Sequence, residues 1–204
     1  MILDVHTHTD RYSPCSTISL EELISAERRK VDGIAVTDHD HLLSEREAEY
    51  LSGKYDFTVL PGVEISAEGI YAHILAFGIE REIRPGLGVE ETIAKIHEQG
   101  GVAVAAHPLR YVDELDRRKW RGIDCIETLT PNCSLRQNMR AREIASDWRF
   151  PQIGSSDAHS PFTVGTYATL FNNNIANVDQ LKKDLLKGEA EPITLWTHPR
   201  RRGV

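Results

Sequence analysis

Histidines and acidic residues gather at the ends of apolar runs in this chain, and no other feature of the sequence constrains the fold as strongly. Six of the nine histidines lie in such positions, mostly where a run that reads as a β-strand ends. These positions are His6, His8, His39, His73, His107 and His159, accompanied by the carboxylates Glu64 and Asp157. In a β/α barrel, strand ends on one face are neighbours in space however far apart they lie in sequence. Gathering six imidazoles and two carboxylates at one place is unfavourable in electrostatic and solvation terms unless cations bind among them. The pattern therefore predicts a multinuclear metal site in a hydrolase.

Strand-like and helix-like segments alternate along most of the chain, which favours an α/β fold with a parallel sheet. Ser19 and Glu22 form a capping box for a helix that continues to about Val31. Further helices are expected over residues 89–99, 134–147 and 177–187, and short strands over 125–129 and 167–171. About seven strands predict a closed or nearly closed TIM-like barrel, with the site at the carboxyl ends of its strands.

Length and charge narrow the functional classes. With 204 residues, we expect one barrel domain over residues 1–204, ending in a short basic tail at 197–204. The net charge of −7 argues against a stable nucleic-acid complex. No apolar run approaches the ~20 residues of a membrane span, and no secretory leader is recognisable. Three cysteines without CxxC spacing favour a reducing compartment, and we expect a cytoplasmic protein.

Spacing singles out individual ligands. His6 and His8 alternate with apolar or small residues, so both imidazoles point to one side of a strand and can bind one ion at ~2.0–2.1 Å. Asp157 and His159 repeat this spacing. Glu64 follows a rigid Pro-Gly-Val approach, and a carboxylate there can bridge two cations.

The remaining histidines carry less weight when taken singly. His107 ends an apolar run before Pro108, which makes it a good ligand candidate. His39 between two aspartates also fits a solvated acidic turn, and His73 also fits an ordinary edge strand. We do not expect ligands at three positions in a turn, a helix and the tail, namely His41, His97 and His198.

The ordered motifs HxH, TDH, PGVE, a lone histidine, HP and SDAH, from His6 to His159, resemble the polymerase and histidinol phosphatase (PHP) superfamily. The resemblance implies a distorted (β/α)₇ barrel with a trinuclear site, and many members are phosphoesterases. It further implies three ligand sets: His6, His8, Glu64 and Asp157 for the first metal; Glu64, His73 and His107 for the second; His39 and His159 for the third.

The chain departs from the family pattern in the loop after HxH. Many relatives place an aspartate or histidine there, whereas Cys15 occupies the aligned position here. A Cys15 thiolate would favour zinc or ferrous iron over manganese. Asp10 is another ligand candidate from the same loop, and Cys15 can also simply pack beneath it.

Arginines near the motifs are candidates for phosphate binding, because a guanidinium fork suits phosphate oxygens. We expect this role of Arg110, three residues after His107. Three arginines on the face of a predicted helix are expected to be mostly solvated, namely Arg136, Arg140 and Arg142. Three arginines of the tail either reach the site or belong to a frayed end, namely Arg200, Arg201 and Arg202. About fifty residues separate His107 from Asp157, too few for a cap domain.

Together these features predict a metal-dependent phosphoric ester hydrolase. Two or three zinc, manganese or iron ions would activate a bridging hydroxide toward a small phosphorylated substrate, a phosphomonoester or short nucleotide. Glu64, Asp157 and His159 are the candidate catalytic residues, and His159 or Asp157 would protonate the leaving group. Three alternatives stay open: a nuclease acting on 3′ or 5′ ends, an amidohydrolase-like enzyme, for which a strand-end lysine is missing, and a non-catalytic metal-binding module.

Overall fold

The computed structural model describes residues 1–68 and 71–195. The basic tail predicted at 197–204, with His198 and its arginines, lies outside the described residues. The strands are β1 (Ile2–Thr7), β2 (Gly33–Val36), β3 (Thr58–Pro61), β4 (Val63–Ser66), β5 (His73–Phe77), β6 (Val102–Ala106), β7 (Cys125–Leu129), β8 (Gln152–Gly154), β9 (Tyr167–Phe171) and β10 (Ala190–Thr194). The helices are α1 (Leu20–Glu27), α2 (Glu45–Tyr55), α3 (Val89–Glu98), α4 (Leu135–Trp148) and α5 (Val178–Lys187).

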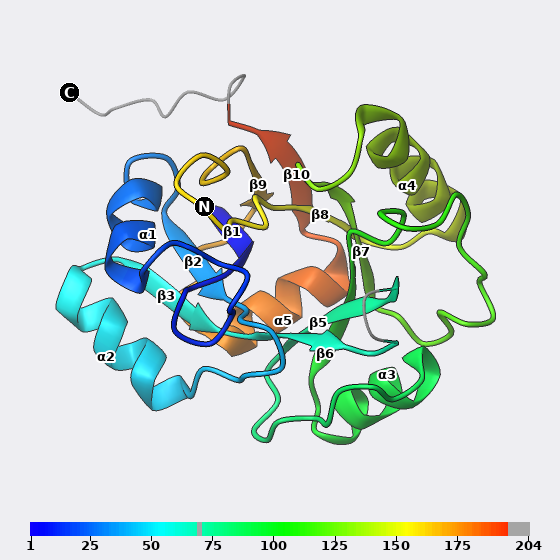
Figure 1. Cartoon of the computed structure of the whole chain (residues 1–204), viewed down its shortest axis with the longest axis horizontal. Helices are drawn as coiled ribbons and strands as arrows, with labels where there is room; N and C mark the ends of the chain where they lie inside the picture. The colour runs from blue at the N-terminus through cyan, green and yellow to red at the C-terminus, as the bar shows by residue number, and fades with distance from the viewer. Residues whose placement is uncertain (69–70, 196–204) are drawn as a thin grey trace.

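The strands form two five-stranded sheets in the orders β10-β9-β1-β2-β3 and β4-β5-β6-β7-β8 (Figure 1). Both sheets are mixed. β9 runs antiparallel to β1 and β10, and β5 runs antiparallel to β4 and β6, while the other neighbours are parallel. The α/β class is confirmed, but the described strands do not close into the single seven-stranded barrel that we predicted. The hairpin β4–β5 and the antiparallel pair β9 and β10, which α5 connects, account for the departure from a regular βα alternation.

The apolar run over residues 59–64, which contains the Pro-Gly-Val approach to Glu64, is split between the two sheets. β3 ends at Pro61 and β4 begins at Val63, so the chain passes from one sheet to the other at Gly62. A Cβ atom on Gly62 would lie 2.8 Å from Phe77 Cε1 and 2.9 Å from Thr37 Cγ2. Only glycine fits this crossing without displacing a neighbour.

Three apolar clusters hold the layers together. The first lies between the two sheets and includes Leu3, Val5, Leu60, Leu75, Phe77, Val104, Leu181 and Leu185. Helix α5 closes one end of this interior, where Lys182 packs on Gly78 just after β5 and the amide of Ile175 contacts Met1 Sδ. The opposite end, which carries the carboxyl termini of the parallel strands, is therefore left for the candidate site.

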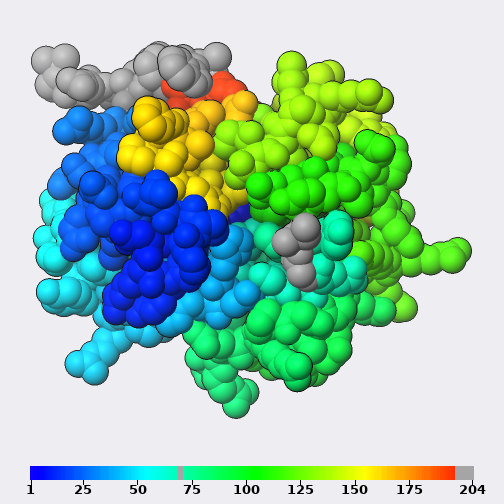
Figure 2. Space-filling model, viewed as in Figure 1, coloured from blue at the N-terminus to red at the C-terminus, as the bar shows by residue number. Residues whose placement is uncertain are grey.

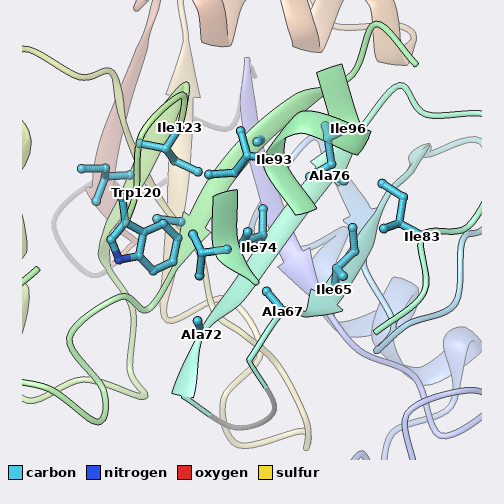
Figure 3. Packing of buried hydrophobic residues seen from close by; sticks show 14 of the residues in the cluster. Ile65, Ala67, Ala72, Ile74, Ala76, Ile83, Ile93, Ile96, Trp120 and Ile123 are labelled. Atoms are coloured by element: carbon cyan, nitrogen blue, oxygen red, sulfur yellow. The ribbon is translucent and has the colours of Figure 1, made fainter. Parts of the chain in front are cut away.

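The outer faces of the sheets are covered by the other helices. Ile93 and Ile96 of α3 pack on Ile65 and Ile74 of the second sheet, with Trp120 beside them (Figure 3). Helices α1 and α2 cover the first sheet through a cluster that includes Leu23, Ile24, Ile34, Leu51 and Val59. Among the described residues, none of the helices combines the length and apolar character needed to cross a membrane.

Helix signals in the sequence are confirmed at most ends. The capping box of Ser19 and Glu22 is present, although α1 stops at Glu27, earlier than Val31. Asn177 accepts from the amide of Gln180 at the start of α5, and Gly188 ends that helix with φ of 68°. Helix α2, capped by Ser44, was not predicted, because it carries few apolar residues and buries only Ala48 and Leu51.

Candidate metal centre

The predicted ligands converge at one end of the sheets, although they come from six strands or the loops after them. His6 and His8 lie at the end of β1, His39 follows β2, His107 follows β6, and Asp157 and His159 follow β8. Glu64 is in β4, and isolated bridges join Thr7 to Ala158 and His39 to Glu64. Figure 2 shows the face on which the loops after β1, β6 and β8 meet.

His73 reaches this cluster in a way that the sequence did not indicate. We expected it to end a strand, but it is the first residue of β5. Because β5 is antiparallel to β6, with His73 opposite Ala106, its amino end lies beside the carboxyl end of β6. The antiparallel direction of β5 therefore places His73 at the same edge of the sheet as His107, which follows β6.

Four buried ligand atoms form a compact group. His6 Nε2 lies 3.2 Å from Glu64 Oε2 and 3.3 Å from Asp157 Oδ1, and His8 Nε2 lies 3.1 and 3.0 Å from the same two oxygens. A tetrahedron with metal–ligand bonds of ~2.0–2.1 Å has edges of roughly 3.3–3.4 Å. The four imidazole–carboxylate distances, 3.0–3.3 Å, are therefore close to the spacing of ligands around one small cation.

Glu64 contacts ligands on both of its oxygens. Oε2 faces His6 and His8 and also lies 3.2 Å from His39 Nδ1. Oε1 lies 2.8 Å from His73 Nδ1 and 2.9 Å from His107 Nε2. The carboxylate is fully buried among five imidazoles, which is the position a bridge between two cations requires.

Three groups of potential ligands occur among the described residues. They are His6, His8, Glu64 and Asp157; His39, Glu64 and His73; and His8, His39 and His159. The first equals the set that the resemblance implies for one metal. The second contains His39 where His107 was expected, and the third contains His8 but not Cys15.

The hydrogen-bond network fixes which imidazole nitrogens face the cluster. Ser13 Oγ donates to Asp38 Oδ1 at 2.7 Å and lies 3.1 Å from His8 Nδ1. Since the hydroxyl proton goes to Asp38, Nδ1 of His8 is the donor and its Nε2 presents a lone pair. Asp38 also accepts from the amide and hydroxyl of Thr9, so this aspartate supports the loop and is not a solvated turn residue.

Several buried polar atoms have no hydrogen-bond partner within the part of the chain that the structure describes, and five of them point into the cluster. They are His6 Nε2, His8 Nε2, His39 Nδ1, Glu64 Oε2 and Asp157 Oδ1. Unpaired buried polar atoms are costly and rare in native proteins. Five such atoms at one place indicate that a bound group satisfies them. A cation fits this role, because the nitrogens and oxygens can each offer a lone pair.

Glu127 is a site residue that sequence reasoning missed. It lies in β7, almost fully buried, with Oε1 3.1 Å from His6 Nδ1 and Oε2 accepting from the amide of His107 at 2.6 Å. Ser155 Oγ also donates to it. The available signal was a glutamate two residues after the inward-facing Cys125, at a position where strand alternation predicts an apolar side chain.

Backbone strain accompanies two of the ligands. His107 and Asp157 have φ of 28° and 44°, in the left-handed region that non-glycine residues avoid. Asn132, in the loop after β7, donates to Asp157 Oδ2. Such strained backbone conformations persist only where surrounding contacts enforce them, and this occurs commonly at functional sites.

Charge balance in the metal-free cluster is unusual. Burial disfavours a charged His8, but Asp157 and Glu64 outweigh burial and raise the pKa of His8 to about 9. Burial likewise opposes charge on His6, and the same carboxylates still raise the pKa of His6 well above its ordinary value. In return, despite burial, the histidines hold the pKa values of Glu64 and Asp157 well below the usual range. Protons thus occupy places that cations can take.

The histidines at the outer edge behave differently. Burial lowers the pKa of His39 to about 4, against a weaker opposing effect of Glu64. Burial, reinforced by His8, also lowers the pKa of His159. Both are partly exposed, at 23% and 24%, and both are neutral near pH 7, the form in which a histidine binds metal.

Cys15 and Asp10 do not join the ligand groups. Cys15 is a free, exposed cysteine, and burial of its thiol together with the nearby Glu64 and Asp157 charges raises its pKa. Asp10 is also exposed, with its amide bonded to the carbonyl of Ile18. The loop instead supplies Ser13, which orients His8.

Arg110 lies in the turn after His107, whose carbonyl accepts from the Arg110 amide at 2.9 Å. Its guanidinium carbon lies 5.1 Å from the centre of the Tyr111 ring. Arg140 pairs with Glu114 and Glu143 on the surface, as expected of a helix-face arginine. His41 contacts Tyr12 and Glu82, and His97 contacts Asp124, so both lie outside the cluster as predicted.

Comparison with known proteins places this geometry in a family. A family model described as "PHP-associated" matches residues 136–190. The uncharacterized protein MJ1587 of Methanocaldococcus jannaschii is 35% identical over 120 residues, covering 53% of this chain and 68% of that protein.

Solved structures share the fold at lower identity. A two-domain Bacteroides vulgatus protein containing a predicted PHP-like metal-dependent phosphoesterase matches with a TM-score of 0.75 and 15% identity, over 95% of this chain and 64% of that one. The lesion-specific endonuclease EndoQ of Pyrococcus furiosus matches with a TM-score of 0.63 and 20% identity, over 94% of this chain and 57% of that one. This chain therefore spans about three fifths of either structure. With the family match, the ordered motifs and the converging ligands, the chain belongs to the polymerase and histidinol phosphatase (PHP) superfamily.

Proposed function

We propose that this chain is a metal-dependent phosphoesterase acting on a small phosphate ester. The observation that supports it most is the buried group of His6, His8, Glu64 and Asp157, whose inward-facing atoms lie 3.0–3.3 Å apart across the imidazole–carboxylate contacts and lack hydrogen-bond partners among the described residues. Divalent ions held there would stabilise charge on a phosphate and lower the pKa of a water nucleophile.

A neutral imidazole offers one lone pair, so each histidine is assigned to one ion. His6, His8, Glu64 and Asp157 would hold one ion, Glu64, His73 and His107 a second, and His39 and His159 a third. A donor set dominated by imidazole suits zinc or iron, with manganese also compatible through the carboxylates. Glu64 bridges, and we propose two or three ions in total.

In the two-ion arrangement His159 holds no metal, and we propose that it handles the leaving-group proton, with Asp157 as the alternative. His159 is partly exposed at the cluster's edge, with Nδ1 2.9 Å from the Asp157 carbonyl and 3.3 Å from its Oδ1. A leaving oxygen can therefore approach the ring from solvent, whereas Asp157 faces the ligands. Arg110, in the turn beside His107, is proposed to bind a phosphate oxygen.

A compact substrate fits the charge of the chain better than a long polyanion. The net charge of −7 offers no general basic track for a nucleic acid backbone. We therefore propose a phosphomonoester or short nucleotide as substrate in the cytoplasm, without a stable nucleic-acid complex. End-directed nuclease activity is the second candidate, favoured by the shared fold with the Pyrococcus furiosus endonuclease.

The test compares kcat/KM of metal-loaded protein for a phosphomonoester panel and a single-stranded oligonucleotide across a salt series. We expect phosphomonoesters to be preferred. Asp157→Asn should lower turnover at least a hundredfold, while Asp147→Asn, on the exposed face of α4, should have no effect. Faster cleavage of the oligonucleotide, falling steeply with salt, would favour the nuclease, and inactivity on every substrate would contradict a hydrolase.

Arg110→Ala gives a second readout. Its contact with phosphate should strengthen as charge develops on phosphorus, so the variant should raise KM and lower kcat. Arg136→Ala is the matched control, since Arg136 is exposed on α4. Equal kinetics of the two variants would remove Arg110 from the substrate site.

A further inference from the structure

Two exposed tyrosines, Tyr71 and Tyr111, lie close in the chain to two of the proposed metal ligands. Tyr71 is 65% exposed and Tyr111 is 45% exposed, and their ring centres lie 6.3 Å apart at an interplanar angle of 78°. Large exposed aromatic groups next to a polar site commonly mark a place where ligands bind. Arg110 lies over the Tyr111 ring, and in an edge-to-face pair a ring receives its partner on at most one face, so at least one face of Tyr71 contacts neither Tyr111 nor Arg110.

Both tyrosines are held close to metal ligands by the fold. Tyr71 precedes His73 by two residues, which span at most ~7 Å of chain. Tyr111 follows His107 by four residues, through the turn in which the Arg110 amide donates to the His107 carbonyl. Since His73 pairs with Ala106 across β5 and β6, the two segments that carry the tyrosines leave the sheet side by side.

Arg110 lies between His107 and Tyr111 in the chain, and its side chain contacts the aromatic pair. Its guanidinium carbon lies 5.1 Å from the Tyr111 ring centre, so a positive charge is stacked on one ring of the pair. Moving along the chain from His107, a metal ligand, a cation and an aromatic ring follow in order. A nucleotide carries a phosphate, which suits the ligand cluster and Arg110, at one end, and a planar base, which suits an aromatic ring, at the other.

We propose that Tyr71 and Tyr111 form a stacking platform for the base of a nucleoside phosphate whose phosphate lies at the metal cluster. This inference rests on the proposed phosphoesterase function and narrows its substrate class. Stacking of a base on an aromatic side chain contributes ~1–3 kcal/mol. That range corresponds to roughly 5- to 150-fold in binding.

The experiment compares adenosine 5′-monophosphate with ribose 5-phosphate, which share phosphate and sugar and differ only in the base. Each is used as an inhibitor of p-nitrophenyl phosphate hydrolysis by metal-loaded protein. We expect an inhibition constant about tenfold or more lower for the nucleotide. Tyr71→Ala and Tyr111→Ala should bring this ratio toward one, whereas the two Tyr→Phe variants should keep it.

Two further variants serve as controls. Tyr50→Ala removes an equally exposed tyrosine from α2 and should leave the ratio unchanged. Phe162→Ala removes a ring that is 96% exposed on the loop after His159. Loss of the ratio in Phe162→Ala but not in the tyrosine variants would place the base elsewhere and overturn the proposal.

Equal inhibition constants in the unmodified protein, or a ratio that survives both alanine substitutions, would also overturn it. Failure of the phosphoesterase proposal is distinguishable, because p-nitrophenyl phosphate and the wider phosphomonoester panel would then not be hydrolysed. Calorimetric titration of the metal-loaded protein with the two ligands would still measure their affinity ratio. The platform is contradicted if that ratio is one.

Discussion

His6 Nδ1 lies 3.1 Å from Glu127 Oε1, and neither side chain is exposed to solvent. The second Glu127 oxygen accepts a hydrogen bond from the amide of His107. One carboxylate therefore orients the ring of one ligand and the backbone of another. Because Nδ1 of His6 faces a carboxylate, its proton resides there and Nε2 is free to bind metal. Glu127 therefore acts through His6 as a positioning residue.

Glu127→Gln should weaken metal binding by roughly 10- to 100-fold while the protein stays folded, since partners of metal-binding histidines contribute this much. The amide keeps the shape of the side chain but loses the charge that supports the His6 Nδ1 proton. Competition with a chelator of known affinity measures the change. Glu143→Gln, on the surface of α4, is the control, and equal affinities of the two variants would contradict a role for Glu127.

Metal binding should release protons and reverse the pH dependence of stability. The pKa of His8 is raised to about 9, so without metal the contribution of His8 to the free energy of unfolding is complete below about 6.5 and is lost as pH rises through about 9. Metal-free protein should therefore become less stable over that window. Metal-loaded protein should gain stability there, because the ions compete with protons for the same nitrogens.

Calorimetric titration of metal at pH 7.5, in buffers of different ionisation enthalpy, measures the protons released, and thermal unfolding at several pH values measures the stability. We expect at least one proton per cluster. Exhaustive chelation should lower the melting temperature and abolish hydrolysis. An unchanged melting temperature together with unchanged hydrolysis would contradict a metal centre.

Side-chain spacing predicted that His6 and His8, and likewise Asp157 and His159, would point to one side, because an i, i+2 pair at a strand end does so whatever the rest of the fold. The meeting of the other ligands was expected from the barrel arrangement of strand ends and from the family resemblance. Spacing could not predict strand direction. The alternating pattern around His73 is the same in either orientation, so the antiparallel placement of β5 was missed. Glu127 was missed for a related reason: an acid within a short strand reveals its role only when the inward face is known.

The loop after β1 shows a different limit. Cys15 and Asp10 were candidates by alignment to a family pattern, whereas Ser13, with its small hydroxyl, takes the supporting contacts to His8 and Asp38. Loop residues are placed by hydrogen bonds whose partners come from distant segments. Period and spacing carry no information about those partners.

Glu64→Gln should be far more damaging than Cys15→Ser. Glu64 contacts five imidazoles through both oxygens, and an amide can neither bridge two cations nor balance their charge. We expect loss of nearly all turnover and of at least one bound metal in Glu64→Gln, and near-normal values in Cys15→Ser. Metal content and kcat measured together decide the ranking. An equally severe loss in Cys15→Ser would make the cysteine a ligand.

A buried carboxylate pair beneath the cluster should limit stability at neutral pH. Asp4 and Glu27 are fully buried, and neither Glu27 oxygen has a hydrogen-bond partner among the described residues. Burial, partly offset by Ser156, raises the pKa of Asp4 to about 6, and burial together with the Asp4 charge raises that of Glu27 well above its usual value. For acids with raised pKa values, the penalty appears as pH rises above about 4 and grows through the folded-state pKa.

Glu27→Gln should therefore raise the free energy of unfolding by about 1 kcal/mol or more at pH 7.5, and this gain should shrink toward pH 5. The amide can also donate to Asp4, which lowers the cost of its charge. Chemical denaturation at both pH values measures the difference. Glu98→Gln, at the exposed end of α3, should change neither value, and a destabilised Glu27→Gln at pH 7.5 would show that the charge is not the dominant cost.

Substitution at the sheet crossing should couple stability to the metal centre. A Cβ at Gly62 would lie 2.8 Å from Phe77 and 2.9 Å from Thr37, both fully buried, two residues before Glu64. Neither neighbour can move freely, so Gly62→Ala should destabilise the protein by ~1–3 kcal/mol and weaken metal binding through Glu64. Gly53→Ala is the matched control, because nothing lies within 4 Å of its added Cβ in α2 and alanine should stabilise the helix by ~0.5–1 kcal/mol. Denaturation curves and chelator competition for both variants test this, and a Gly62→Ala protein with unchanged stability and metal affinity would contradict the steric argument.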